Sequence, residues 1–126
     1  MEEQIEKAIQ ARNIAYSPYS NYKVGACLKT KNGKLYTGCN IENNGILSIC
    51  AERVAFVKAL SDGEKNFESI VVVGGKDDLE LTMPCGYCRQ FISEFVDNEF
   101  NIIAYKDDSN IKTLKITDLL PYRFSL

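Results

Sequence analysis

The sequence predicts an α/β fold with three layers, α/β/α, around a mixed five-stranded sheet. Segments with helical periodicity alternate with short β-rich segments, in the order helix, two strands, helix, strand, helix, strand, strand. An Asn-Gly turn joins the first two strands, which is typical of an antiparallel hairpin, whereas a helix separates the next pair, which indicates a parallel crossover. The chain has 126 residues, 45% of them hydrophobic. This suits one core, so we expect a single domain over residues 1–126.

The N-terminal elements follow from periodicity and turn signals. Apolar residues recur at helical spacing up to the Ser-Pro pair at residues 17–18, and the Asn, Gly and Ser content before Cys50 indicates a loop, where substrate contacts are expected. The expected elements are a helix over residues 2–16, strands over 22–28 and 35–40 around a turn at 31–34, and a loop over 41–49.

The later elements follow from composition. An unbroken β-branched run ending in two glycines is typical of a central strand that is buried on both faces. Ser48 is a plausible N-cap for the helix that follows it, and Pro84 suits the first turn of the next helix. The expected elements are helices over residues 50–60 and 84–96, strands over 70–73, 102–105 and 113–116, a polar connection over 77–82, and a helical turn over 118–120.

Charge and hydropathy exclude several classes of function. The formal net charge is −2, so there is no general positive field to hold nucleic acid, and a small, weakly charged ligand fits better. The N-terminus has no basic and apolar leader, and no run of about 18 apolar residues occurs. We therefore expect a cytoplasmic protein that binds neither nucleic acid nor membranes.

The cysteine and histidine counts narrow the chemistry. Five cysteines are an odd number, which favours thiols or metal ligands over a disulfide framework. Histidine is absent, which excludes Ser-His and Cys-His nucleophiles and all histidine metal sites. Any zinc must be held by sulfur or carboxylate.

Three cysteines and one glutamate have the spacing of an open zinc site. Cys85 and Cys88 lie one helical turn apart, and Cys50 begins another helix, so the three thiolates can hold one Zn²⁺ and leave its fourth position for water. Glu52 points away from Cys50 on a helix, which makes it a poor ligand and a better proton acceptor beside the open position. Three thiolates leave a net charge of −1 on the site. We expect the helix N-termini and the neighbouring Arg53 and Arg89 to offset it.

Other interpretations of these residues stay open. The Cys85 to Cys88 pair also resembles a redox pair, and Cys27 or Cys39 would close a structural zinc site as a fourth ligand; neither arrangement needs Glu52. Cys27 and Cys39 lie within the hairpin strands and are expected to be small core residues. The Asp pairs at 77–78 and 107–108 lie in turn-like surroundings and are expected to be solvated.

The two cysteine blocks, Cys-Ala-Glu-Arg at 50–53 and Pro-Cys-Gly-Tyr-Cys-Arg-Gln at 84–90, resemble those of the cytidine deaminases of the zinc-dependent deaminase superfamily. The resemblance extends to residues 19–26, 38–43 and 119–124. It implies that Cys50, Cys85 and Cys88 hold zinc and that Glu52 moves protons. The reaction implied is hydrolytic deamination of cytidine or deoxycytidine to the uridine form, with release of ammonia.

The resemblance also implies the substrate contacts. Asn40 and Glu42 would hold a sugar hydroxyl, Tyr22 would pack near the nucleoside, and Ala51 would lie against the substrate. Phe124 would reach into a neighbouring subunit's site, because the family members concerned are homotetramers with active sites between subunits. The small-molecule partner expected is therefore a free nucleoside rather than a polynucleotide.

The loop at residues 44–49 departs from the family pattern. It is one residue shorter than usual and has no aromatic residue, and in the family it contributes to the pocket between subunits. A deaminase of a modified cytosine nucleoside, of the blasticidin S type, is therefore an alternative, although retention of Glu42 argues against it. A structural zinc or redox module without hydrolytic activity is the alternative from another class.

Overall fold

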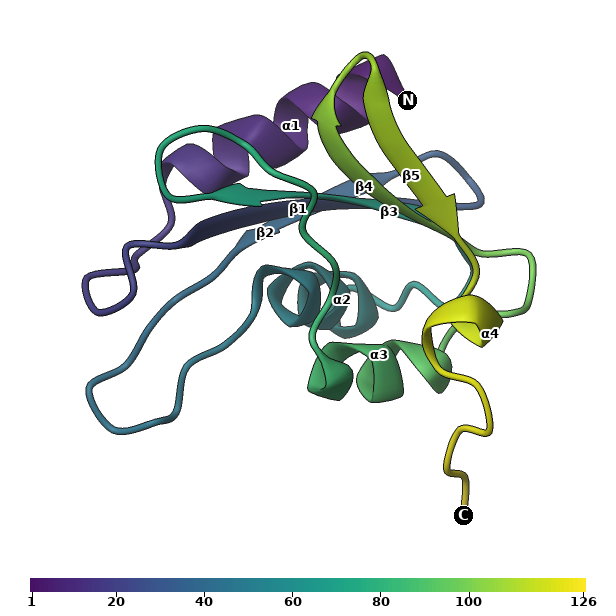
Figure 1. Cartoon of the computed structure of the whole chain (residues 1–126). Helices are drawn as coiled ribbons and strands as arrows, with labels where there is room; N and C mark the ends of the chain where they lie inside the picture. The colour runs from purple at the N-terminus through teal and green to yellow at the C-terminus, as the bar shows by residue number, and fades with distance from the viewer.

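The structure is a computed structural model that describes residues 1–126, and its elements occur in the predicted order (Figure 1). No helix is long and apolar enough to cross a membrane. The helices are α1 (Glu2–Asn13), α2 (Ala51–Ser61), α3 (Gly86–Ser93) and α4 (Ile116–Leu119). The strands are β1 (Lys23–Thr30), β2 (Leu35–Cys39), β3 (Phe67–Gly75), β4 (Asn101–Asp107) and β5 (Asn110–Leu114).

The sheet is mixed, as predicted, with the strand order β2-β1-β3-β4-β5. The hairpin strands β1 and β2 pair antiparallel around Gly33, whose φ of +91° is the left-handed conformation that the Asn-Gly turn requires. The central strand β3 pairs parallel with β4 across the α3 crossover, which confirms that prediction. Strand β5 returns antiparallel to β4 at the edge.

Helix α1 covers one face of the sheet, and α2 and α3 cover the other, so the three layers are as expected (Figure 1). Alternation along the strands divides the core between the two faces. Cys27 and Val71 pack with Ala8 of α1, whereas Leu28 and Val72 pack with the α2 and α3 side, which holds the larger cluster. Cys27 is therefore a core residue, as predicted, and Cys39 is half-buried.

Several predicted boundaries were wrong. Helix α1 ends at Asn13 rather than at residue 16, and β5 ends at Leu114 rather than at residue 116, because Ile116 already begins α4. Two more predictions were wrong at helix starts. Ser48 does not cap α2; its hydroxyl accepts from the Asn43 amide, and Cys50 is the N-cap. Pro84 does not lie in the first turn of α3, because Cys85 is extended and acts as the N-cap, with its Sγ accepting from the Cys88 amide. The first cysteine of each block therefore lies one residue before its helix.

Helix α3 is also shorter than predicted. It ends at Ser93, because the amides of Glu94 and Phe95 bond to carbonyls three residues back, which tightens the last turn and ends the α-helical pattern. The chain then turns so that Phe95 and Phe100 pack into the larger core cluster.

Candidate active site

Three cysteines from two helix starts converge at one end of the molecule. The Sγ atoms of Cys50, Cys85 and Cys88 all lie within 4.8 Å of one another, and those of Cys50 and Cys85 are 3.7 Å apart. Cys50 and Cys85 are N-caps, so their sulfurs lie at the positive ends of α2 and α3, where thiolates are stabilised. Cys88 faces the core from the first turn of α3 and is fully buried.

The close approach of α2 to the sheet depends on Gly38 of β2. A Cβ atom on Gly38 would lie 2.3 Å from the Ala51 carbonyl oxygen and 2.7 Å from the Ala55 amide nitrogen. Only glycine lets the helix start lie this close to the strand. Gly38 thereby fixes the position from which Cys50 and Glu52 project.

The three sulfurs fit a zinc ion. Tetrahedral zinc with Zn–S bonds of about 2.3 Å separates its sulfur ligands by about 3.8 Å, which is close to the observed spacing. Neither Cys27 nor Cys39 belongs to the cluster, so the geometry offers no fourth thiolate for a closed structural site. Three thiolates leave one corner of such a tetrahedron for a ligand that is not protein.

The cluster is arranged to carry negative charge at Cys50. A hydrogen bond from Cys88 lowers the pKa of Cys50 to about 5, and Arg53 adds to this effect. In the same pair the pKa of Cys88 is raised, because Cys88 donates to Cys50 and is buried. The pair therefore favours negative charge at Cys50 over Cys88, and metal binding displaces the protons that remain on the thiols.

Glu52 is the buried acid of the site. Its side chain is 3% exposed, and burial raises its pKa to about 7, with the charge on Cys50 acting in the same direction. A carboxyl group with this pKa can accept and return a proton at neutral pH, which an exposed glutamate does poorly. Glu52 lies in the first turn of α2, beside the cysteine cluster, but it is not one of the residues whose ligand atoms are grouped there.

The two arginines next to the ligands have different contacts. Arg53 Nη2 lies 3.7 Å from Cys50 Sγ and 3.4 Å from the Ser48 carbonyl, and its guanidinium lies 4.1 Å from the centroid of the Tyr87 ring. Arg89, in contrast, donates to the carbonyls of Pro84 and Leu119 and to no sulfur. Only Arg53 therefore offsets thiolate charge through a direct contact.

A pocket of about 230 Å³ opens beside the cluster. Asn40 lines it and is fixed on β1, because its Oδ1 accepts from the Val24 amide and its Nδ2 donates to the Tyr22 carbonyl. Acidic, aliphatic, aromatic and sulfur-containing side chains surround the remaining space. The lining residues are Tyr22, Val24, Asn40, Cys50, Ala51, Glu52, Thr82, Met83 and Cys85.

Two of the expected substrate residues lie outside this pocket. The Glu42 carboxylate accepts from the amides of Tyr19 and Ser20 and from the Ser20 hydroxyl, which lowers its pKa. These contacts stabilise the turn at residues 19–22, whereas the family resemblance implies that Glu42 holds a sugar hydroxyl together with Asn40. Asn40 and Glu42 therefore do not face the same cavity within one chain.

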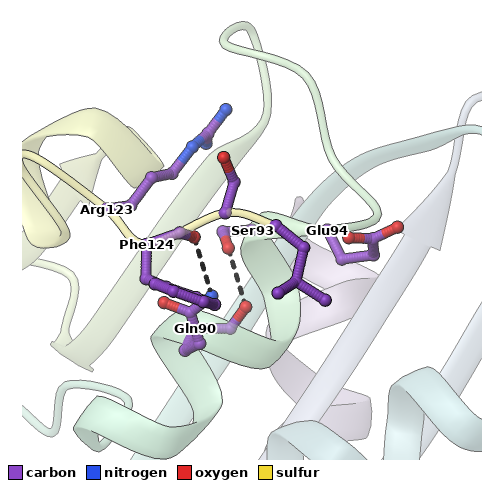
Figure 2. A pocket seen from close by; sticks show the side chains of 7 residues that line it. Gln90, Ser93, Glu94, Arg123 and Phe124 are labelled. Carbon is purple, nitrogen blue, oxygen red and sulfur yellow. Dashed lines mark hydrogen bonds between the residues drawn. The ribbon is translucent and has the colours of Figure 1, made fainter.

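Phe124 lies in the C-terminal segment, beside α3. It lines a separate pocket of about 540 Å³ together with Gln90, Ser93 and Glu94, and Gln90 Nε2 donates to its carbonyl (Figure 2). The Phe124 side chain is 67% exposed. In one chain it does not join the residues around Glu52.

Sequence reasoning did not single out Thr82, Met83 or Tyr87. Thr82 and Met83 line the pocket just before the second cysteine block, and Tyr87 lies between two ligands in that block. All three residues lie within three positions of Cys85 in the sequence, and this closeness could have marked them as candidates. The contact of Thr82 with Tyr22 and that of Tyr87 with Arg53 depend on the tertiary structure.

A three-thiolate metal cluster at two helix starts, with a buried carboxyl group beside its open side, defines a zinc-dependent hydrolase on an α/β/α fold. The family model described as "Cytidine and deoxycytidylate deaminase zinc-binding region" matches residues 1–104. The chain belongs to this family of zinc-binding deaminases.

Individual relatives agree over nearly the whole chain. The cytidine deaminase of Sporosarcina psychrophila is 40% identical over 126 residues, covering 99% of this chain and 91% of the relative. The crystal structure of cytidine deaminase from Burkholderia pseudomallei superposes with a TM-score of 0.88 at 40% identity and covers 98% of both chains. That of cytidine deaminase from Mycobacterium tuberculosis gives 0.82 at 33% identity, covering 99% of this chain and 97% of the other. Fold and family are thus established together.

Proposed function

We propose that this protein hydrolyses cytidine and deoxycytidine to uridine and deoxyuridine with release of ammonia. The observation that carries the proposal is the buried Glu52 carboxyl group, in the wall of a small pocket that also contains two of the three clustered cysteines. Membership of the deaminase family and the names of its relatives support the same reaction.

Each residue of the site then has a chemical task. Zinc, when bound by Cys50, Cys85 and Cys88, supplies Lewis-acid activation of water. Glu52 takes one proton from the attacking water at a carboxylate oxygen and returns it to the ring nitrogen. After the water oxygen has bonded to C4, Glu52 passes the second proton from that oxygen to the amine, and the C–N bond breaks as the C4 carbonyl forms. Arg53 offsets the negative charge at Cys50, and the buried Ala51 forms the floor against which a flat pyrimidine fits.

The pocket favours a free nucleoside. Its volume of about 230 Å³ suits one nucleoside, and the net charge of −2 provides no basic groove for a polynucleotide backbone. Asn40 has one amide hydrogen and one oxygen lone pair left after its contacts with β1, which suits a sugar hydroxyl. Tyr22 provides an aromatic wall on the same side.

The proposal includes a homotetramer with active sites between subunits. Ile46, Leu47 and Phe124 are 96%, 74% and 67% exposed, so their apolar side chains are free to be buried against other copies. Phe124, and Glu42 after rearrangement, would then complete a neighbour's pocket. Five cysteines without a disulfide suit a reducing cytoplasm. The proposed reaction, which turns free cytosine nucleosides into uracil nucleosides, suits a role in pyrimidine salvage.

The experiment combines turnover with metal content. Purified protein is assayed for zinc by elemental analysis and for ammonia release from cytidine, deoxycytidine and blasticidin S, with the ultraviolet spectrum recorded for each. We expect one zinc per chain and turnover of the first two substrates. Turnover of blasticidin S alone would support the modified-nucleoside alternative, and zinc without turnover of any substrate would support a structural module.

A further inference from the structure

A pair of hydroxyl groups joins two walls of the pocket. Tyr22 Oη and Thr82 Oγ1 are 2.7 Å apart and form a hydrogen bond in which either group can donate. Tyr22 directly precedes β1, Thr82 precedes the second cysteine block, and both line the pocket beside Glu52. The contact therefore links the aromatic wall to the segment that supplies Cys85.

Tyr22 is held at three points. Its amide donates to the Ser20 hydroxyl at 3.0 Å, and its carbonyl accepts from Asn40 Nδ2 at 2.8 Å. These two contacts fix the main chain but leave the side-chain torsions free. The bond to Thr82 fixes the far end of the ring, and because burial raises the pKa of Tyr22, the phenol keeps its proton at neutral pH.

Thr82 is itself rigidly supported. It packs on Gly74 of β3, where a Cβ atom would lie 2.5 Å from Thr82 Oγ1, and the Glu80 amide donates to the Gly74 carbonyl at 2.8 Å. The buried Arg12 of α1 donates through Nη2 to the carbonyls of Gly75 and Asp77 at 2.7 and 2.9 Å. The segment that carries Thr82 is thereby anchored to the sheet and to α1.

We propose that Thr82 is a positioning residue that holds the ring of Tyr22 in the orientation that receives the nucleoside. The inference rests on the proposed function. Valine at position 82 keeps the shape of threonine but leaves the Tyr22 hydroxyl without this partner, so the ring gains freedom that nucleoside binding must then remove. The loss falls on binding rather than on the chemical step, because neither hydroxyl is assigned a proton in the reaction.

The test is a double-mutant cycle on the zinc-loaded enzyme with Thr82→Val, Tyr22→Phe and the double variant. Loss of a neutral hydrogen bond predicts a KM for cytidine about 3- to 10-fold higher for Thr82→Val, with kcat within about 2-fold of the wild type. The KM of the double variant is expected to be no higher than that of the more impaired single variant, because both changes remove the same bond.

Two further variants make the test specific. Thr82→Ser keeps the hydroxyl and is expected to restore KM to near the wild-type value, and Thr113→Val, on the exposed edge strand β5, is the matched control and should leave KM unchanged. An unchanged KM in Thr82→Val, multiplying effects in the double variant, or a Thr82→Ser as impaired as Thr82→Val would overturn the inference.

Tyr22→Phe removes the same bond from the other end, so it decides the question even where Thr82→Val does not fold. A wild-type enzyme without activity on cytidine and deoxycytidine contradicts the proposed function instead. If the wild type is active and Thr82→Val and Tyr22→Phe have the same KM as the wild type, only the role of Thr82 is contradicted.

Discussion

The N-termini of α2 and α3 both contribute cysteines to the cluster that can hold a metal ion, yet their surroundings differ. At the start of α2, Ala51 and Glu52 are buried, and the helix lies directly against Gly38. At the start of α3, Cys85 is exposed, and a Cβ atom added to Gly86 would meet nothing within 4 Å. The buried start of α2 carries Glu52, whose pKa is raised by burial. The open start of α3 carries the exposed Cys85, which lines the pocket.

The contacts of the neighbouring arginines follow the same division. Arg53, on the buried side, contacts Cys50 Sγ and stacks on Tyr87, which itself comes from α3. Arg89, on the open side, ties the Pro84 carbonyl to α4 through Leu119 and so supports the loop. One arginine acts on the electrostatics of the cluster and the other on the position of its backbone.

The largest expected effect tests whether both helix starts hold the metal. Cys50→Ser and Cys85→Ser are each expected to reduce bound zinc from one per chain to nearly none and to abolish turnover, because each removes one of only three thiolates. Cys39→Ser is the matched control and should retain zinc. The measurement is elemental analysis after gel filtration, and zinc loss in Cys39→Ser would mean that the site is closed rather than open.

The second largest effect is expected from removing the carboxyl group of Glu52, at the buried start of α2. Glu52→Gln keeps the shape of the side chain but cannot take up a proton, so we expect kcat to fall by at least about 10² to 10⁴ while bound zinc stays at one per chain. Ammonia release and zinc content are measured on the same sample. Activity within about 2-fold of the wild type would remove Glu52 from the mechanism.

The metal-free protein reveals the cost of burying this acid. The pKa of Glu52 is raised from 4.5 to about 7, so its contribution to stability is fully present below pH 4.5 and is lost as pH rises through 7. The difference corresponds to about 3 kcal/mol. Metal-free Glu52→Gln should therefore be more stable than the metal-free wild type at pH 8 and equal to it at pH 4.

Urea unfolding of the two proteins at both pH values measures this difference directly. Comparison at equal pH cancels the titration of the cysteines to first order, because both proteins contain them. Equal unfolding midpoints at pH 8 would show that the carboxyl group is solvated and not buried.

The smallest expected effect concerns the contact that joins the two helix starts. Tyr87→Leu removes the aromatic face beneath Arg53, a contact worth about 0.5–1 kcal/mol at an exposed site, so zinc should dissociate about 2- to 5-fold faster into a chelator. Tyr87→Phe keeps the face and should match the wild type, and Tyr19→Leu serves as the control at another exposed tyrosine. Equal rates for Leu and Phe at position 87 would mean that the stack does not position Arg53.

The order of elements and the metal-binding cysteines were predictable from the sequence because local patterns encode them. The β-branched run of β3 and the Asn-Gly turn each specify one conformation, and cysteine blocks at helix starts have a recognisable spacing. The helix boundaries were less predictable. The helix that was predicted to include Pro84 in its first turn begins at Gly86, because the Cys85 sulfur caps it.

The contacts of long polar side chains could not be predicted from spacing. Arg89 and Arg53 are both adjacent to a ligand, but only the tertiary structure decides that one finds carbonyls and the other a sulfur. Glu42 lies two residues after Asn40, but the strand ends at Cys39, so alternation no longer governs where Glu42 points. Thr82 required knowledge of which segment lies opposite Tyr22.

Gly38 does not line the pocket, yet it sets the depth at which the Glu52 carboxyl group lies. A single methyl group there would require α2 to retreat from the strand and to carry Cys50 and Glu52 outward with it. A residue outside the pocket therefore decides how far into it the acid and the first cysteine of the cluster reach.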